Sequence, residues 1–142
     1  MGKLSVQAFV SQYISHANLV AEKTGVPALV TLAQAALESG WGEHAPNYNF
    51  FGMTAGSNWT GKTNTYTNSA GKPITLRVYD SALQAFADYA NNLTTSRYSA
   101  AFSYTDNPEM FLKKVVEGGY TKDAGYYSLC ISVMKSIKKY VL

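Results

Sequence analysis

The chain has 142 residues, of which 46% are hydrophobic and 15% are charged, and its formal net charge is +3. This length and composition predict one globular domain with a sizeable core and exclude a disordered chain. The weak, dispersed positive charge does not favour nucleic acid, and no segment reaches the roughly 20 apolar residues of a membrane span. We therefore expect neither nucleic-acid binding nor membrane insertion.

Cysteine and histidine give little indication of a cofactor. The only cysteine, Cys130, excludes an intramolecular disulfide and lies in an apolar helical pattern, which predicts a buried thiol. His16 and His44 have no partners at a spacing that fits zinc, so we expect no metal and no other cofactor. The first residues lack the apolar block of a signal peptide, so we expect another export route, as for a phage lysin, or a signal already removed.

Two helices are predicted in the first part of the chain. Apolar residues at helical spacing predict the first helix over residues 5–22, with Gly25 at its end. Pro27 is expected at the first position of the second helix, which runs to residue 39 and stops at Gly40. Because residues 26–37 carry no charge, this second helix should be buried on most sides.

The second helix ends on a single carboxylate, Glu38, within Ala-Ala-Leu-Glu-Ser-Gly-Trp-Gly at residues 35–42. This position is where a buried helix meets solvent, so partial desolvation should raise the pKa of Glu38. A carboxylic acid that keeps its proton near neutral pH can act as a general acid on a sugar leaving group. An ordinary residue at a helix end is the alternative, and these eight residues alone favour neither.

Residues 40–79 are rich in Gly, Asn, Thr and Tyr and show no helical period. Two segments, 63–67 and 74–79, flank a turn at 68–71 and predict a β-hairpin insert over about residues 60–79. Pro73 near the start of the second strand is compatible with an edge strand.

The helical period returns after Asp80. Ser-Ala-Leu-Gln at residues 81–84 is a capping box that opens a helix, and Asp80 is interpreted as a helix-start residue. A short helical turn is predicted at 98–102, a helix after Asn107 that ends at Gly118, and a last helix from about Asp123. The predicted fold is α+β, mostly α, with the hairpin beside a helical core.

Many aromatic residues lie in polar segments. Flat rings stack on sugar faces while amides and hydroxyls bond to sugar hydroxyl groups, so this pattern favours carbohydrate binding. The alternative is that such rings cap the core with a polar edge. Both interpretations stay open for Trp59 and Tyr66, each of which could stack on a sugar ring.

Four further motifs follow Glu38 in order: Tyr-Asn-Phe-Phe-Gly-Met (48–53), Asn-Trp-Thr-Gly (58–61), Leu-Arg-Val-Tyr-Asp-Ser (76–81) and Gly-Tyr-Thr-Lys-Asp (119–123). Together they resemble the endo-β-N-acetylglucosaminidase domains of glycoside hydrolase family 73, especially the flagellar type of peptidoglycan hydrolase. The resemblance covers about residues 9–140. It implies that residues 1–142 form one lysozyme-like domain, with a helical lobe, a small β-hairpin lobe and a groove between them.

The resemblance also implies an activity and its residues. It implies hydrolysis of the β-1,4 bond on the reducing side of N-acetylglucosamine in peptidoglycan, with Glu38 as general acid. It assigns a functional role to Tyr120, for which a core tyrosine under a turn is the alternative. Trp41 is expected to pack beneath Glu38 as an apolar wall. The expected substrate-binding residues are Trp41, Asn49, Phe51, Trp59, Tyr66, Asp123 and Tyr126.

One departure from the family pattern concerns the second acid. Family members often carry a second carboxylate on the hairpin, but this chain has no Asp or Glu between His44 and Tyr79. The alternatives are attack by the 2-acetamido group of the substrate, a lytic transglycosylase with a lone acid, or a distant acid such as Asp123. We favour the first. A glycan-binding module without catalysis is a rival of another class, and we expect a monomer that acts on the bacterial cell wall.

Overall fold

The computed structural model describes residues 2–141 of the chain. Within them lie five α-helices, two 3₁₀ helices and a two-stranded sheet. In chain order the elements are α1 (Val6–Thr24), α2 (Ala28–Ser39), η1 (Pro46–Tyr48), β1 (Thr63–Thr67), β2 (Pro73–Arg77), α3 (Ala82–Leu93), η2 (Ser96–Tyr104), α4 (Pro108–Glu117) and α5 (Tyr126–Lys138). The prediction of a mostly helical α+β fold with one hairpin is confirmed.

The first two helices lie close to their predicted bounds. Ser5 caps α1 by accepting the Ala8 N–H at 3.1 Å, and Gly25 ends it with a φ of +88°. Pro27 is the N-cap of α2 rather than its first residue, because its backbone is extended. The prediction for the start of α2 was therefore wrong by one residue.

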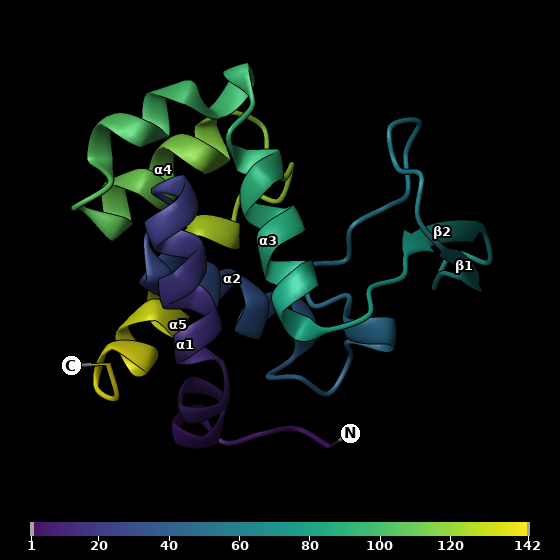
Figure 1. Cartoon of the computed structure of the whole chain (residues 1–142), viewed down its shortest axis with the longest axis horizontal. Coiled ribbons are helices and arrows are strands. Elements are labelled where there is room, and N and C mark those ends of the chain that lie inside the picture. Colours follow the sequence, from purple (N-terminus) through teal and green to yellow (C-terminus); the bar gives the residue numbers. More distant parts are fainter. Residues whose placement is uncertain (1, 142) are drawn as a thin grey trace.

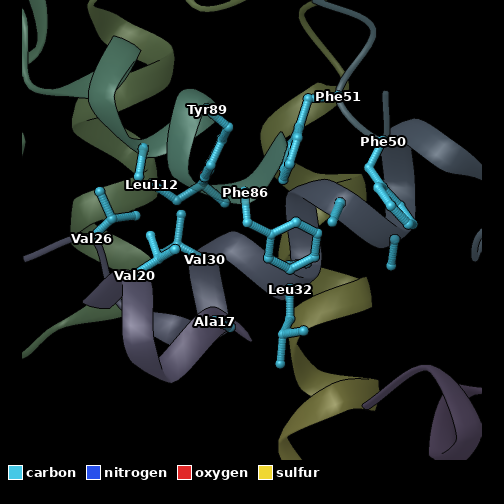
Figure 2. Close-up of a cluster of buried hydrophobic side chains, with 14 of the residues drawn as sticks. Ala17, Val20, Val26, Val30, Leu32, Phe50, Phe51, Phe86, Tyr89 and Leu112 are labelled. Atoms are coloured by element: carbon cyan, nitrogen blue, oxygen red, sulfur yellow. The ribbon is translucent and has the colours of Figure 1, made fainter. Parts of the chain in front are cut away.

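Helix α2 is the centre of the helical lobe, as its charge-free sequence predicts. It packs against α1, α4 and α5, and most of its residues are buried. Figure 2 shows Val30 and Leu32 among apolar side chains of α1 and α3, including Val20 and Phe86. Because each buried Å² of apolar surface stabilises the fold by about 25 cal/mol, this packing makes α2 a rigid support for Glu38 at its end.

The hairpin lies apart from the bundle of helices, on the side away from α4 and α5 (Figure 1). In its antiparallel register Thr63 faces Arg77 and Thr67 faces Pro73. Strand β2 ends two residues earlier than predicted. The reason is that Tyr79 turns its ring into the core and bonds its N–H to Asn47 O at 3.1 Å.

The helices after the hairpin follow the predicted order. Ser81 caps α3 by accepting the Gln84 N–H, and Gln84 in turn accepts the Asp80 N–H, as expected for a helix-start residue. The 3₁₀ segment η2 is longer than the predicted turn at 98–102. Helix α5 begins at Tyr126 and not near Asp123, because the Asp123 side chain accepts the Gly125 N–H at 2.8 Å and forms a turn instead.

Two further observations complete the fold. Cys130 is fully buried on α5, as predicted, and burial followed by the charge of Glu38 raises the pKa of its thiol to about 12. Among the described residues no helix combines the length and apolar character needed to cross a membrane.

Candidate active site

Glu38 lies in the last turn of α2, where this buried helix reaches the surface. The helix ends tightly around it: Ser39 Oγ donates to Ala35 O at 2.6 Å and accepts the Gly42 N–H at 2.9 Å. Gly40 has a φ of +58°, a left-handed conformation that glycine adopts without steric cost. These contacts fix the direction in which the Glu38 side chain leaves the helix.

A cleft of about 740 Å³ opens in front of Glu38. Its walls come from α2, the segment after η1, β2, α3, η2 and the loop after α4. The lining residues are Glu38, Phe51, Gly52, Met53, Thr54, Arg77, Tyr89, Asn92, Leu93, Thr95, Arg97, Tyr98, Tyr120 and Thr121. Glu38 is the only carboxylate among these described residues, so the cleft presents a single acid and not a pair.

The carboxyl of Glu38 has a raised pKa. Desolvation by the surrounding walls raises it, although Glu38 opens to the cleft, and a hydrogen bond from Tyr126 partly opposes the shift. The direction agrees with the expectation from the sequence. A raised pKa keeps the proton on Glu38 to higher pH than on a free glutamate, which is the state a general acid requires.

Three tyrosines surround this carboxyl: Tyr89 of α3, Tyr120 after α4 and Tyr126 of α5. Tyr120 lines the cleft, and its ring centroid lies 5.8 Å from that of Tyr126. Burial, and then the charge of Glu38, raise the pKa of Tyr120 well above its ordinary value. Its hydroxyl is therefore protonated and can donate a hydrogen bond beside Glu38.

The turn before Tyr120 is held by an arginine that the sequence analysis did not single out. Arg97 Nε donates to Gly118 O at 3.1 Å, and its Nη2 donates to Gly119 O at 3.0 Å. Gly119 has a φ of +95°, and a Cβ there would lie 2.6 Å from Arg97 Nη2. The two glycines thus allow the close approach of Arg97, and this contact sets the path of the chain into Tyr120.

A second group missed from the sequence links the hairpin to α3. Arg77 Nη1 lies 2.7 Å from Asp88 Oδ2, and the Tyr79 hydroxyl donates to the same oxygen at 2.6 Å. Arg77 Nε also donates to Thr54 O at 2.8 Å. The positive charge of Arg77, at the edge of the cleft, is therefore paired with the Asp88 carboxylate. The sequence around Arg77 does not indicate this ion pair, because Asp88 belongs to a different element, helix α3.

Phe51 and Trp41 differ in their placement. Phe51 lines the cleft and stacks on Tyr89, with ring centroids 4.0 Å apart and an interplanar angle of 7° (both are labelled in Figure 2). The Trp41 ring meets Phe9 of α1 edge-on at 5.6 Å and does not line the cleft. The aromatic residues that line the cleft with Glu38 are Phe51, Tyr89, Tyr98 and Tyr120, and its neighbour in sequence is not among them.

Asn49 lies beneath the cleft and is 2% exposed. Its Nδ2 donates to Met53 O and to Arg77 O, each at 3.0 Å, while its Oδ1 accepts the Met53 N–H at 2.9 Å. All these partners are backbone groups, so its amide ties the segment that follows η1 to the hairpin.

Replacing Asn49 with alanine is expected to destabilise the domain by about 1–3 kcal/mol, because it leaves buried backbone groups without a partner. Urea unfolding measures this free energy. Asn58→Ala, at an exposed position of the same segment, is the matched control. Equal stability of the two variants would show that the Asn49 amide is not needed to hold the hairpin.

The other candidate residues do not line the cleft. Trp59 Nε1 donates to Lys62 O at 2.9 Å, and its ring lies under the Arg77 guanidinium at 5.0 Å. Tyr66 accepts a hydrogen bond from Asn47 at 3.1 Å and lines a separate surface hollow beside residues 42–46. Tyr126 is 6% exposed, and it lies near enough to Glu38 to lower the pKa of that carboxyl.

Asp123, considered from the sequence as a distant second acid, is exposed and makes its contact with Gly125. It is not among the residues that line the cleft. Within residues 2–141, His, Cys, Asp and Glu side chains form no group of three that could hold a metal ion.

A helical lobe, a small hairpin and a single carboxyl in a cleft are features of a lysozyme-like glycoside hydrolase. The family model described as glucosaminidase, mannosyl-glycoprotein endo-beta-N-acetylglucosaminidase, matches residues 14–139. The chain therefore belongs to this glucosaminidase family, and the predicted membership of glycoside hydrolase family 73 is confirmed.

Relatives and solved structures support the same family. The chain is 34% identical to the peptidoglycan hydrolase FlgJ of Escherichia coli K12, over 93% of this chain and 47% of FlgJ. It therefore spans about half the length of the curated relatives that it matches. The glycoside hydrolase domain of Salmonella typhimurium FlgJ is 33% identical, with a TM-score of 0.84 over 96% of this chain and 90% of that one. The peptidoglycan hydrolase of Sphingomonas sp. A1 is 36% identical, with a TM-score of 0.84 over 95% and 92%. The lysozyme-like fold is thereby confirmed.

Proposed function

We propose that this domain cleaves bacterial peptidoglycan at the β-1,4 bond on the reducing side of N-acetylglucosamine, with Glu38 as general acid. The observation that carries the proposal is one carboxyl with a raised pKa, in a cleft without a second carboxylate. Family membership and relatives named as peptidoglycan hydrolases support the substrate. The site of action would be the bacterial cell wall, and the domain would act as a monomer.

A lone acid is compatible with a substrate-assisted reaction. In the first step the carbonyl oxygen of the 2-acetamido group bonds to the anomeric carbon. The bond to the glycosidic oxygen breaks, and that oxygen takes the proton of Glu38. In the second step the Glu38 carboxylate takes a proton from water, whose oxygen attacks the anomeric carbon and restores the acetamide. Two displacements retain the anomeric configuration.

Tyr120 is proposed to act in the same reaction. Its protonated hydroxyl lies at the cleft near Glu38, held by the turn that Arg97 fixes. A neutral donor there stabilises negative charge left on Glu38 after proton transfer, or orients the acetamide. Phe51 contributes an apolar surface to the same cleft.

Product analysis on defined peptidoglycan tests bond and mechanism together. We expect mass spectrometry of the released muropeptides to show reducing N-acetylglucosamine ends, and NMR to show that they form first as the β-anomer. Anhydro-muramic ends would instead establish the lytic transglycosylase. Reducing muramic acid ends would place the cut on the other side of the disaccharide. Binding to cell walls without any released sugar would establish a glycan-binding module.

A further inference from the structure

A chain of buried hydrogen bonds runs from Tyr89, in the cleft wall, through Gln34 to Tyr126, and the last two residues do not line the cleft. Gln34, one helical turn before Glu38 on α2, is 0% exposed and lies in an otherwise apolar helix. Its Oε1 accepts a hydrogen bond from the Tyr89 hydroxyl, and its Nε2 donates to the Tyr126 hydroxyl oxygen at 3.2 Å. A buried amide costs stability unless its polar groups are paired, and both ends of Gln34 are paired here.

The direction of these hydrogen bonds is fixed by chemistry. The Gln34 amide nitrogen can only donate, so the Tyr126 oxygen accepts there and its own hydrogen is free to point elsewhere. The neighbouring polar groups are Glu38, one turn after Gln34 on the same face of α2, and Tyr120, whose ring centroid lies 5.8 Å from that of Tyr126. Tyr89 fixes the amide from the far end, because its hydroxyl donates to the Gln34 carbonyl oxygen and so determines which end of the amide faces Tyr126.

We propose that Gln34 is a positioning residue for the reaction, which holds the Tyr126 hydroxyl so that it donates to the Glu38 carboxylate formed after proton transfer. The inference rests on the proposed function, since it concerns the same acid. The inference goes beyond the proposed function because Gln34 does not line the cleft, so its role would be to position Tyr126 and not to bind substrate. The consequence is a carboxyl that keeps its proton to higher pH than a free glutamate, and whose carboxylate has a buried donor once the proton has left.

Other groups also face Glu38 and set the background against which this effect is measured. They are Tyr89 of α3, Tyr120 of the loop after α4 and Cys130 of α5, together with the cleft arginines Arg77 and Arg97. Tyr126→Phe leaves all of these groups unchanged, whereas Gln34→Met also removes the acceptor of the Tyr89 hydroxyl. A shift in the titration of Glu38 that both variants share therefore reports the Gln34–Tyr126 contact.

The test compares Tyr126→Phe, Gln34→Met and the double variant with the parent domain. We expect Tyr126→Phe and Gln34→Met each to lower kcat roughly tenfold, as expected for a lost hydrogen bond to a charged group. Both should move the alkaline limb of the pH–rate profile to higher pH by up to about one unit, because the carboxylate loses a donor. The double variant should be no worse than Tyr126→Phe, since both changes remove the same interaction.

The chain offers a matched control on α1. Gln12 Nε2 donates to the Tyr13 hydroxyl at 3.2 Å, the same pair of groups at the same distance, away from the cleft. Gln12→Met and Tyr13→Phe should leave kcat and the pH–rate profile unchanged. Thermal unfolding of all variants separates a loss of folded protein from a loss of rate.

A readout that needs no turnover keeps this inference separate from the proposed function. The Glu38 carboxyl, labelled with ¹³C and assigned with Glu38→Gln, can be titrated by NMR in each folded variant. An upward shift of the Glu38 pKa in Tyr126→Phe and in Gln34→Met supports the positioning role of Gln34, even if the enzyme cleaves a different bond from the one proposed. An unchanged pKa in both, or additive losses of kcat in the double variant, would overturn it.

Discussion

Glu38→Gln is expected to lower kcat on peptidoglycan by about 10²–10⁴-fold, the range for loss of a general acid, while the fold is kept. Glutamine has nearly the same size but cannot transfer a proton to the glycosidic oxygen. Because Glu38 lies at the open end of α2 and not in the core, the change should cost little stability. Release of reducing sugar measures the rate, and circular dichroism measures the fold.

The matched control is Glu43→Gln, five residues later, where the carboxylate lies 3.0 Å from His44 at the surface and does not line the cleft. This variant should keep the parent rate. Wild-type digestion of cell walls by Glu38→Gln would remove Glu38 from the mechanism. The pH dependence adds a second check: the raised pKa means that activity should fall as pH rises through a value above that of ordinary glutamate.

The second large effect is expected for Tyr120→Phe, which should lower kcat by about 10- to 100-fold. This range corresponds to a lost hydrogen bond to a charged group of about 1.5–3 kcal/mol. The ring and its packing beside Tyr126 remain, so KM and the melting temperature should change little. Steady-state kinetics on solubilised glycan strands separates kcat from KM.

Tyr127→Phe is the control for this change, because the Tyr127 hydroxyl donates only to Glu109 O at 3.3 Å, outside the cleft. It should leave kcat unchanged. If Tyr120→Phe also keeps the parent kcat, Tyr120 is a core residue under the turn after α4 and its hydroxyl takes no part in the chemistry.

Local sequence signals were sufficient for most of the fold. Ser81 and Asn107 cap the helices that they were predicted to open, because a cap depends only on the next three or four residues. Ser5, predicted as the first residue of the first helix, is its N-cap. The burial of α2 followed from its lack of charge. The errors fall at Pro27, whose extended backbone makes it an N-cap, at Asp123, whose side chain forms a turn with Gly125, and at Tyr79, whose ring is buried in the core.

The sequence by itself determined the family, the order of the elements and the position of Glu38 at the end of a buried helix. Tertiary structure decided what surrounds that acid. Trp41, its neighbour in the chain, packs on α1, whereas Tyr89, Tyr120 and Tyr126 converge on Glu38 from three distant elements. Helix period and capping are properties of adjacent residues, whereas desolvation and hydrogen bonding of one carboxyl depend on how separate elements pack, which no local pattern encodes.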